Sequence, residues 1–134
     1  MALGWAVTKN GRAAEGEPLL REGLDICRRA LPKGDWFTAD AESLLGGCLT
    51  AQERYGEAEP LVLGGYKGLV DATGDPPVTD SWATHCILTL HAIPGAPPLR
   101  TRQALDRIIQ LYEAWGKPDK AAEWRAKRTA AGKD

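Results

Sequence analysis

The feature that most constrains this chain is an internal repeat with a period of 42 residues. When residues 2–28 are aligned with residues 44–70, nine of the 27 pairs are identical, several times the number that unrelated segments share. The identical pairs are Leu3/Leu45, Gly4/Gly46, Thr8/Thr50, Arg12/Arg54, Glu15/Glu57, Glu17/Glu59, Pro18/Pro60, Leu19/Leu61 and Gly23/Gly65. A fixed period of this length is typical of repeat proteins, in which each unit buries its apolar face against a neighbouring unit.

The second copy contains two motifs of small and large apolar residues, spaced like a helix–turn–helix unit. Residues 45–49 read Leu-Gly-x-x-Leu, and residues 58–62 read Ala-x-x-x-Val. The first copy keeps a looser version of both motifs at residues 3–7 and 16–20. The small residues let two helices approach closely, so each copy is expected to form a helical hairpin.

A third, degenerate copy follows the second at a spacing of 63 residues, with Ala121 in the place of Ala58. Tyr112 stands nine residues before Ala121, but Arg125 occupies the large apolar position and lies next to Trp124. Terminal repeats are commonly degenerate because one of their faces meets water.

The same register and the apolar periodicity predict the helices. Residues 12–31 and 54–72 should form equivalent second helices, because they are related by the 42-residue shift. Apolar residues recur at helical spacing over 99–115, Gly116 ends that helix, and a further helix should run to about residue 130.

These motifs, in their common register, resemble the tetratricopeptide repeat (TPR) of the 42-residue, kinesin-light-chain-like type. Residues 53–75 and 100–127 also resemble the C-terminal repeats of large bacterial proteins, some of which carry an N-terminal Ser/Thr kinase domain. The resemblance covers about residues 2–72 and 99–130. No kinase motif is present in the 134 residues themselves.

The resemblance implies an all-α fold, a short right-handed stack of antiparallel helical hairpins of the α-solenoid kind with six or seven helices. The whole chain, 1–134, should be a single domain with repeat copies at about 2–31, 38–72 and 99–130. Between the second and third copies, residues 73–98 contain five of the nine prolines and should form an irregular insertion. Helical spacing predicts an extra or rearranged helix over 80–92, with a short strand as the alternative.

Composition points to a soluble, cytoplasmic protein. Apolar residues make up 43% of the chain, charged residues 26%, and the net charge is −1. An odd number of cysteines, three, suits a reducing compartment, and no run approaches the ~20 apolar residues of a membrane span. Residues 117–134 hold six Lys/Arg against three Asp/Glu, which we interpret as complementing the dipole of a last helix rather than as a nucleic-acid site.

Catalytic, cofactor and metal sites are not expected. His85, Cys86 and His91 invite a metal hypothesis with Cys27 and Cys48 as remote ligands, but their spacing is poor for a shared site. Ser43, Ser81 and His85 have no scaffold such as Gly-x-Ser-x-Gly to position a nucleophile. The sequence therefore predicts a protein that is not an enzyme and carries no cofactor.

The resemblance also assigns a candidate binding groove. In TPR families the register position of Trp5 faces the concave groove, and an exposed tryptophan among polar neighbours is a usual binding anchor. The groove residues implied in this way are Trp5, Thr8, Lys9, Asp40, Ser43, Thr50, Gln103, Asp106, Gln110 and Glu113. They imply a non-catalytic scaffold for a protein or peptide partner of unknown identity. The alternative is that Trp5 is covered by absent or local sequence.

The alternative is a structural, self-associating C-terminal fragment of a larger chain, such as an accessory domain of a bacterial signalling kinase. Leu3, Trp5, Ala6 and Val7 cannot all face the second helix at 100° per residue. Part of this set should therefore be exposed at the N-terminal edge, where self-association is expected.

Overall fold

The computed structural model describes residues 2–72 and 99–132, and this part of the chain consists of helices and turns without a strand. The helices are α1 (Ala2–Lys9), α2 (Ala13–Ala30), α3 (Trp36–Ala51), α4 (Tyr55–Ala72), α6 (Leu99–Ala114) and α7 (Pro118–Gly132). The all-α expectation is confirmed for these residues, and α2 and α4 differ from the predicted spans by one residue or less at each end. The predicted helix over 80–92 lies outside the described residues.

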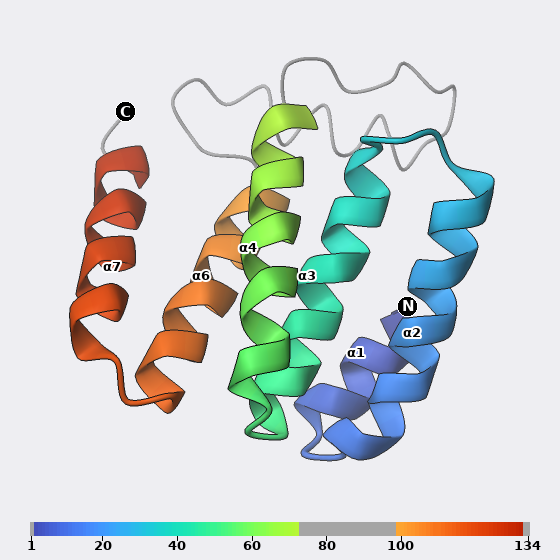
Figure 1. Cartoon of the computed structure of the whole chain (residues 1–134), viewed down its shortest axis with the longest axis horizontal. Coiled ribbons are helices and arrows are strands. Elements are labelled where there is room, and N and C mark those ends of the chain that lie inside the picture. Colours follow the sequence, from blue (N-terminus) through green and yellow to red (C-terminus); the bar gives the residue numbers. More distant parts are fainter. Residues whose placement is uncertain (1, 73–98, 133–134) are drawn as a thin grey trace.

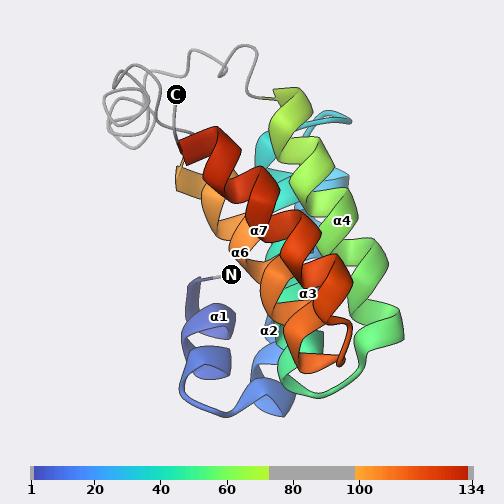
Figure 2. The ribbon, with the colours of Figure 1, turned by 90° about the vertical axis from the view of Figure 1, so that its left-hand side faces the viewer.

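Helices α2, α3, α4, α6 and α7 lie side by side in this order across the molecule, and α1 lies next to α2 and α3 (Figure 1). Each described helix packs against the next one described along the chain, and α3 also contacts α1 and α6. Turning the molecule by 90° places α1 and α4 on opposite sides (Figure 2). One face is therefore formed by α1, α3 and α6, and we call it the α1/α3/α6 face.

In each of the first two hairpins, the two helices come into close contact at a glycine of the first helix. A Cβ added at Gly4 would lie 2.9 Å from Cγ of Leu20, and one added at Gly46 would lie 2.9 Å from the backbone nitrogen of Val62. Gly4 and Gly46, like Leu20 and Val62, are related by the 42-residue shift. The close approach of the two helices is thus repeated at equivalent positions.

The turn between the two helices occurs three times in the same form. The residue with positive φ is Gly11 in the first copy, Glu53 in the second and Gly116 in the third, with φ of 81°, 60° and 75°. The next backbone nitrogen donates to a carbonyl five residues earlier: Arg12 to Val7 (3.1 Å), Arg54 to Leu49 (3.0 Å) and Lys117 to Tyr112 (2.9 Å). The spacings are 42 and 63 residues, so the third hairpin has the same turn as the other two although its helices have diverged.

Replacing Glu53 with glycine should stabilise the chain. Glu53 is the one non-glycine residue among the described residues with positive φ, and a left-handed conformation costs a residue with a Cβ roughly 1–2 kcal/mol. The greater entropy of glycine in the unfolded chain offsets part of this gain. We expect the free energy of unfolding to rise by about 0.5 kcal/mol, measured by urea denaturation. A loss of stability would show that the Glu53 turn is not left-handed.

Candidate functional site

A pocket of about 170 Å³ opens on the α1/α3/α6 face, between side chains of α1 and α6. It is lined by Trp5, Lys9, Gln103, Asp106, Arg107 and Gln110. Five of these six residues belong to the groove set that the register implies, and Arg107 is the addition. The pocket joins residues almost 100 positions apart in the sequence.

Trp5 is half-buried, and its ring packs against α3 at Gly47, which has no side chain. A Cβ added at Gly47 would lie 3.0 Å from Cη2 and from Cζ3 of the indole ring, so the ring rests on the backbone of α3. The guanidinium Cζ of Arg107 lies 4.7 Å from the ring centroid, and Nζ of Lys9 lies 5.6 Å from it. Both distances are within the range of cation–π attraction. Two cations therefore flank the aromatic wall of the pocket.

Arg107 is only 6% exposed although it lines the pocket. Its Nη1 donates to Oγ of Ser43 at 2.9 Å, while its Nε is buried without a hydrogen-bond partner. Burial lowers the pKa of the guanidinium, and the negative charge of Asp40 acts in the opposite direction. An incompletely paired buried donor is costly in a folded protein, so an acceptor that reached it would be strongly favoured.

Asp40 and Ser43 are buried residues of α3 that do not line the pocket. Asp40 is 1% exposed, and its Oδ2 accepts from Nη1 of Arg100 at 2.5 Å. The other carboxylate oxygen, Oδ1, is buried without a partner, as is Oγ1 of Thr101. The guanidinium of Arg100 also lies 5.9 Å from the ring centroid of Trp36. These residues form a polar cluster between α3 and α6.

Three further groove candidates have partners elsewhere. Thr8 and Thr50 donate their hydroxyls to the carbonyls of Gly4 and Gly46, each at 2.9 Å, so these hydroxyls are satisfied by their own helices. Glu113 pairs with Arg125 of α7. None of the three lines the pocket.

Arg107 and Gly47 are the residues that the sequence analysis missed. Helical spacing places Arg107 on the buried side of α6, between Ala104 and Leu111, and a charged residue on an apolar stripe was the available signal. Gly47 is the register counterpart of Trp5, 42 positions later. Trp5 in the first copy and Gly47 in the second therefore occupy the same register position. A glycine at this position leaves space for the ring, and this was the available signal for the contact.

The N-terminal edge exposes part of its apolar set. Leu3 is 66% exposed and Ala6 is exposed, whereas Val7 is half-buried. Trp5 lies in the pocket instead of at this edge. Ile26 of α2, which is 51% exposed, is a further large apolar side chain of the first hairpin that meets solvent.

Metal ligands do not gather in the part of the chain that the structure describes, where no group of three or more His, Cys, Asp and Glu side chains could hold a metal ion. Cys27 and Cys48 are separate buried thiols, and Sγ of Cys48 donates to the carbonyl of Ala13 at 3.1 Å. His85, Cys86 and His91 lie outside the described residues.

Comparisons with known proteins name no relative for this arrangement. No family model, no curated protein and no solved structure matches the chain. Among residues 2–72 and 99–132, every helix is too short or too polar to cross a membrane.

Proposed function

We propose that this chain is a non-catalytic scaffold that binds an acidic segment of a protein or peptide partner on its α1/α3/α6 face. The observation that carries the proposal is the buried, incompletely paired guanidinium of Arg107 at a pocket with a half-buried tryptophan. The repeated turns and glycine contacts support a short TPR-like α-solenoid as the architecture. The free thiols of Cys27 and Cys48 support a cytoplasmic location.

The charges of the pocket favour an anionic group. Lys9 and Arg107 both face it, whereas the carboxylate of Asp106 accepts from Nη1 of Arg128 at 2.8 Å and is already partly neutralised. A carboxylate matches the planar donor fork of an arginine and forms charge-assisted hydrogen bonds with it. The amide groups of Gln103 and Gln110 add donors at the rim. A glutamate or aspartate side chain of the partner supplies acceptor oxygens for these donors.

The indole of Trp5 adds apolar contact area beside these donors. An aromatic anchor in a partly desolvated pocket is the usual centre of a binding surface, with polar groups around it. A partner segment with an acidic residue next to aliphatic residues therefore fits the pocket best. We expect the aliphatic side chains to lie on the ring and the carboxylate to reach Arg107.

The proposal is tested by titrating the full chain with the acetylated, amidated peptide Gly-Leu-Glu-Leu-Gly, followed by NMR shifts of the tryptophan indole signals. We expect the Trp5 signal to move, and we expect Arg107→Met to weaken binding at least tenfold. A hydrogen bond to a charged group contributes roughly 1.5–3 kcal/mol, which corresponds to a factor of ten or more. Methionine keeps the apolar stem of the arginine, so the fold should survive.

Arg125→Met on α7 is the matched control, because Arg125 is paired with Glu113 and does not line the pocket. This variant should bind the acidic peptide like the unmodified chain. Equal binding by the Arg107→Met and Arg125→Met variants would contradict the proposed site.

A further inference from the structure

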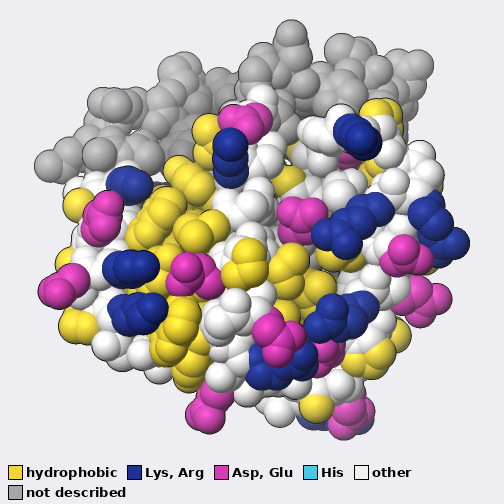
Figure 3. All heavy atoms as spheres, in the orientation of Figure 1, with side chains coloured by type: hydrophobic (Ala, Val, Ile, Leu, Met, Phe, Trp, Pro, Cys, Tyr) yellow, Lys and Arg dark blue, Asp and Glu magenta, His cyan; other side chains and the backbone are white. Residues whose placement is uncertain are grey.

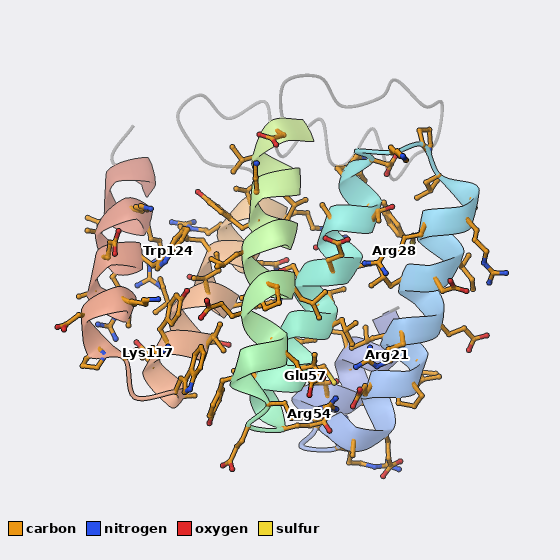
Figure 4. All side chains as sticks on the ribbon, viewed as in Figure 1. Arg21, Arg28, Arg54, Glu57, Lys117 and Trp124 are labelled. Carbon is orange, nitrogen blue, oxygen red and sulfur yellow. The ribbon has the colours of Figure 1, made fainter. Side chains whose placement is uncertain are left out.

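The junction between α2 and the start of α4 is closed by charged and amide side chains, which come from α2 and from the turn that precedes α4. Glu17 of α2 accepts from Nε2 of Gln52 at 2.9 Å, from Nη1 of Arg54 at 2.8 Å and from Nε of Arg21 at 2.8 Å. Burial alone raises the pKa of Glu17, but these hydrogen bonds outweigh it and hold the pKa below its ordinary value. Arg54 and Arg21 lie together at this junction in Figure 4. Both oxygens of the Glu17 carboxylate therefore accept hydrogen bonds, from three donors in total.

The next junction, between α4 and α7, places a glutamate at the same register position without these donors. Glu59 is the counterpart of Glu17, 42 residues later. Other residues occupy the positions that correspond to the three donors. Leu63 corresponds to Arg21, 42 residues later, and Trp115 and Lys117 correspond to Gln52 and Arg54, 63 residues later. Nζ of Lys117 lies 3.5 Å from the ring centroid of Trp115, and Oε2 of Glu59 is buried without a hydrogen-bond partner.

Aromatic side chains take the place of the donors at this junction. Tyr55 stacks on Trp115 with ring centroids 5.8 Å apart, and Tyr66 meets the edge of Trp124 at 5.5 Å. All four rings are half-buried, and we call them the aromatic band. Figure 3 shows hydrophobic side chains gathered in a stripe between the positions of α7 and α4. In Figure 4, Trp124 and Lys117 lie along the α7 side of this stripe.

Charged side chains of both signs surround the aromatic band, but Oε2 of Glu59 has no donor among the described residues. Burial raises the pKa of Tyr112, and the negative charges of Glu59 on α4 and Glu123 on α7 raise it further. Lys127 lies 4.1 Å from the ring centroid of Trp124, and Lys120 lies 5.3 Å from that of Tyr112. The nearby lysines therefore contact ring faces, and none of the described residues donates to Oε2 of Glu59.

We infer that the aromatic band and Glu59 form a second docking surface, for a partner segment in which an arginine is flanked by apolar residues. At the equivalent junction the carboxylate of Glu17 accepts hydrogen bonds from three donors, and two of these donors are guanidinium groups. Glu59 is therefore expected to accept from a guanidinium group as well. Arginine also stacks on aromatic side chains, so it suits a carboxylate that lies next to aromatic rings better than lysine does. The flanking apolar residues cover the half-buried rings. This surface is separate from the pocket at Trp5 and does not depend on it.

The probe is the acetylated, amidated peptide Gly-Leu-Arg-Leu-Gly, titrated into the full chain with the indole signals of Trp115 and Trp124 as the readout. Both signals should shift, and Glu59→Gln should weaken binding at least fivefold, because the amide keeps the shape but loses the charge. Glu17→Gln is the matched control at the same register position. It should lower the melting temperature, since it weakens the α2/α4 network, and leave the affinity for the peptide unchanged.

Leu63→Arg provides an independent test, since it places in α4 the guanidinium that Arg21 supplies in α2. We expect this variant to melt at a higher temperature than the unmodified chain and to bind the basic peptide at least tenfold more weakly. The proposal is contradicted if the basic peptide leaves the Trp115 and Trp124 signals unmoved. It is also contradicted if the Glu59→Gln variant binds this peptide as tightly as the unmodified chain. It is also overturned if Gly-Leu-Glu-Leu-Gly shifts the same two signals equally.

Discussion

Replacing Gly65 with alanine should lower the melting temperature of the chain by roughly 8 °C, equivalent to about 2 kcal/mol of stability. A Cβ at this position would lie 2.7 Å from the backbone nitrogen of Ser43, 2.8 Å from the carbonyl oxygen of Ala39 and 2.9 Å from Cβ of Ser43. Backbone atoms cannot move aside like the end of a side chain, so α3 and α4 must separate. This overpacking outweighs the gain of roughly 1 kcal/mol in helix propensity.

Gly64→Ala is the matched control, one residue away in the same helix. Its added Cβ would meet only Oε2 of Glu42, at 3.7 Å, which is ordinary van der Waals contact. Only the helix propensity changes there, so we expect the melting temperature to rise by roughly 3 °C. Calorimetry that gave both variants the same melting temperature would mean that α3 and α4 do not approach at Gly65.

Replacing Ala58 with leucine should cost about 3 kcal/mol, because the larger side chain has no room. Ala58 is fully buried, and it is the register counterpart of Gly16. At Gly16 even a Cβ would lie 2.5 Å from the carbonyl oxygen of Gly4. Extra carbon atoms in a packed interior force side chains off their rotamers and shift the backbone, at a cost of typically 1–3 kcal/mol.

Ala122→Leu serves as the control for this second substitution. Ala122 is exposed on α7, and alanine and leucine have similar helix propensities, so stability should change by less than about 0.5 kcal/mol. Urea denaturation of the two variants gives the comparison. Equal midpoints would place position 58 away from the contact between the helices.

The helices could be predicted from the sequence because their register repeats. The shift of 42 residues relates α2 to α4, and the motif of small residues marks where each hairpin closes. The third copy was predicted from Tyr112 and Ala121, and its turn at Gly116 has the hydrogen bond of the other two turns. Local turn geometry is set by a few neighbouring residues, so it can persist after the helix faces have diverged.

The candidate site could be predicted only in part, because a register position gives the direction of a side chain but not its partners. Trp5, Lys9 and Gln110 are among the predicted residues that meet at the pocket. Thr8 was assigned to the same face, yet its hydroxyl bonds to its own helix. Arg107 lies on the buried side of α6, where the helical periodicity predicts a hydrophobic residue. Its role depends on Ser43, a contact between residues 64 positions apart.

The two proposed surfaces are expected to bind partners of opposite charge. Arg107 is a buried donor without enough acceptors, whereas Glu59 has a buried acceptor oxygen without a donor. The acidic and basic peptides therefore serve as each other's controls. A substitution that abolishes one proposed interaction should leave the other intact, because the pocket and the aromatic band are formed by different side chains.

The most direct test of the proposed binding site is the measurement of intermolecular nuclear Overhauser effects between the leucine methyl groups of Gly-Leu-Glu-Leu-Gly and the isotope-labelled chain. A peptide bound in the pocket should give contacts from these methyl groups to the indole ring of Trp5 and to the methylene groups of Lys9. Contacts confined to the rings of Trp115 and Trp124, or no contact to Trp5 at saturating peptide, would contradict the assignment of the α1/α3/α6 face as the acidic-segment site.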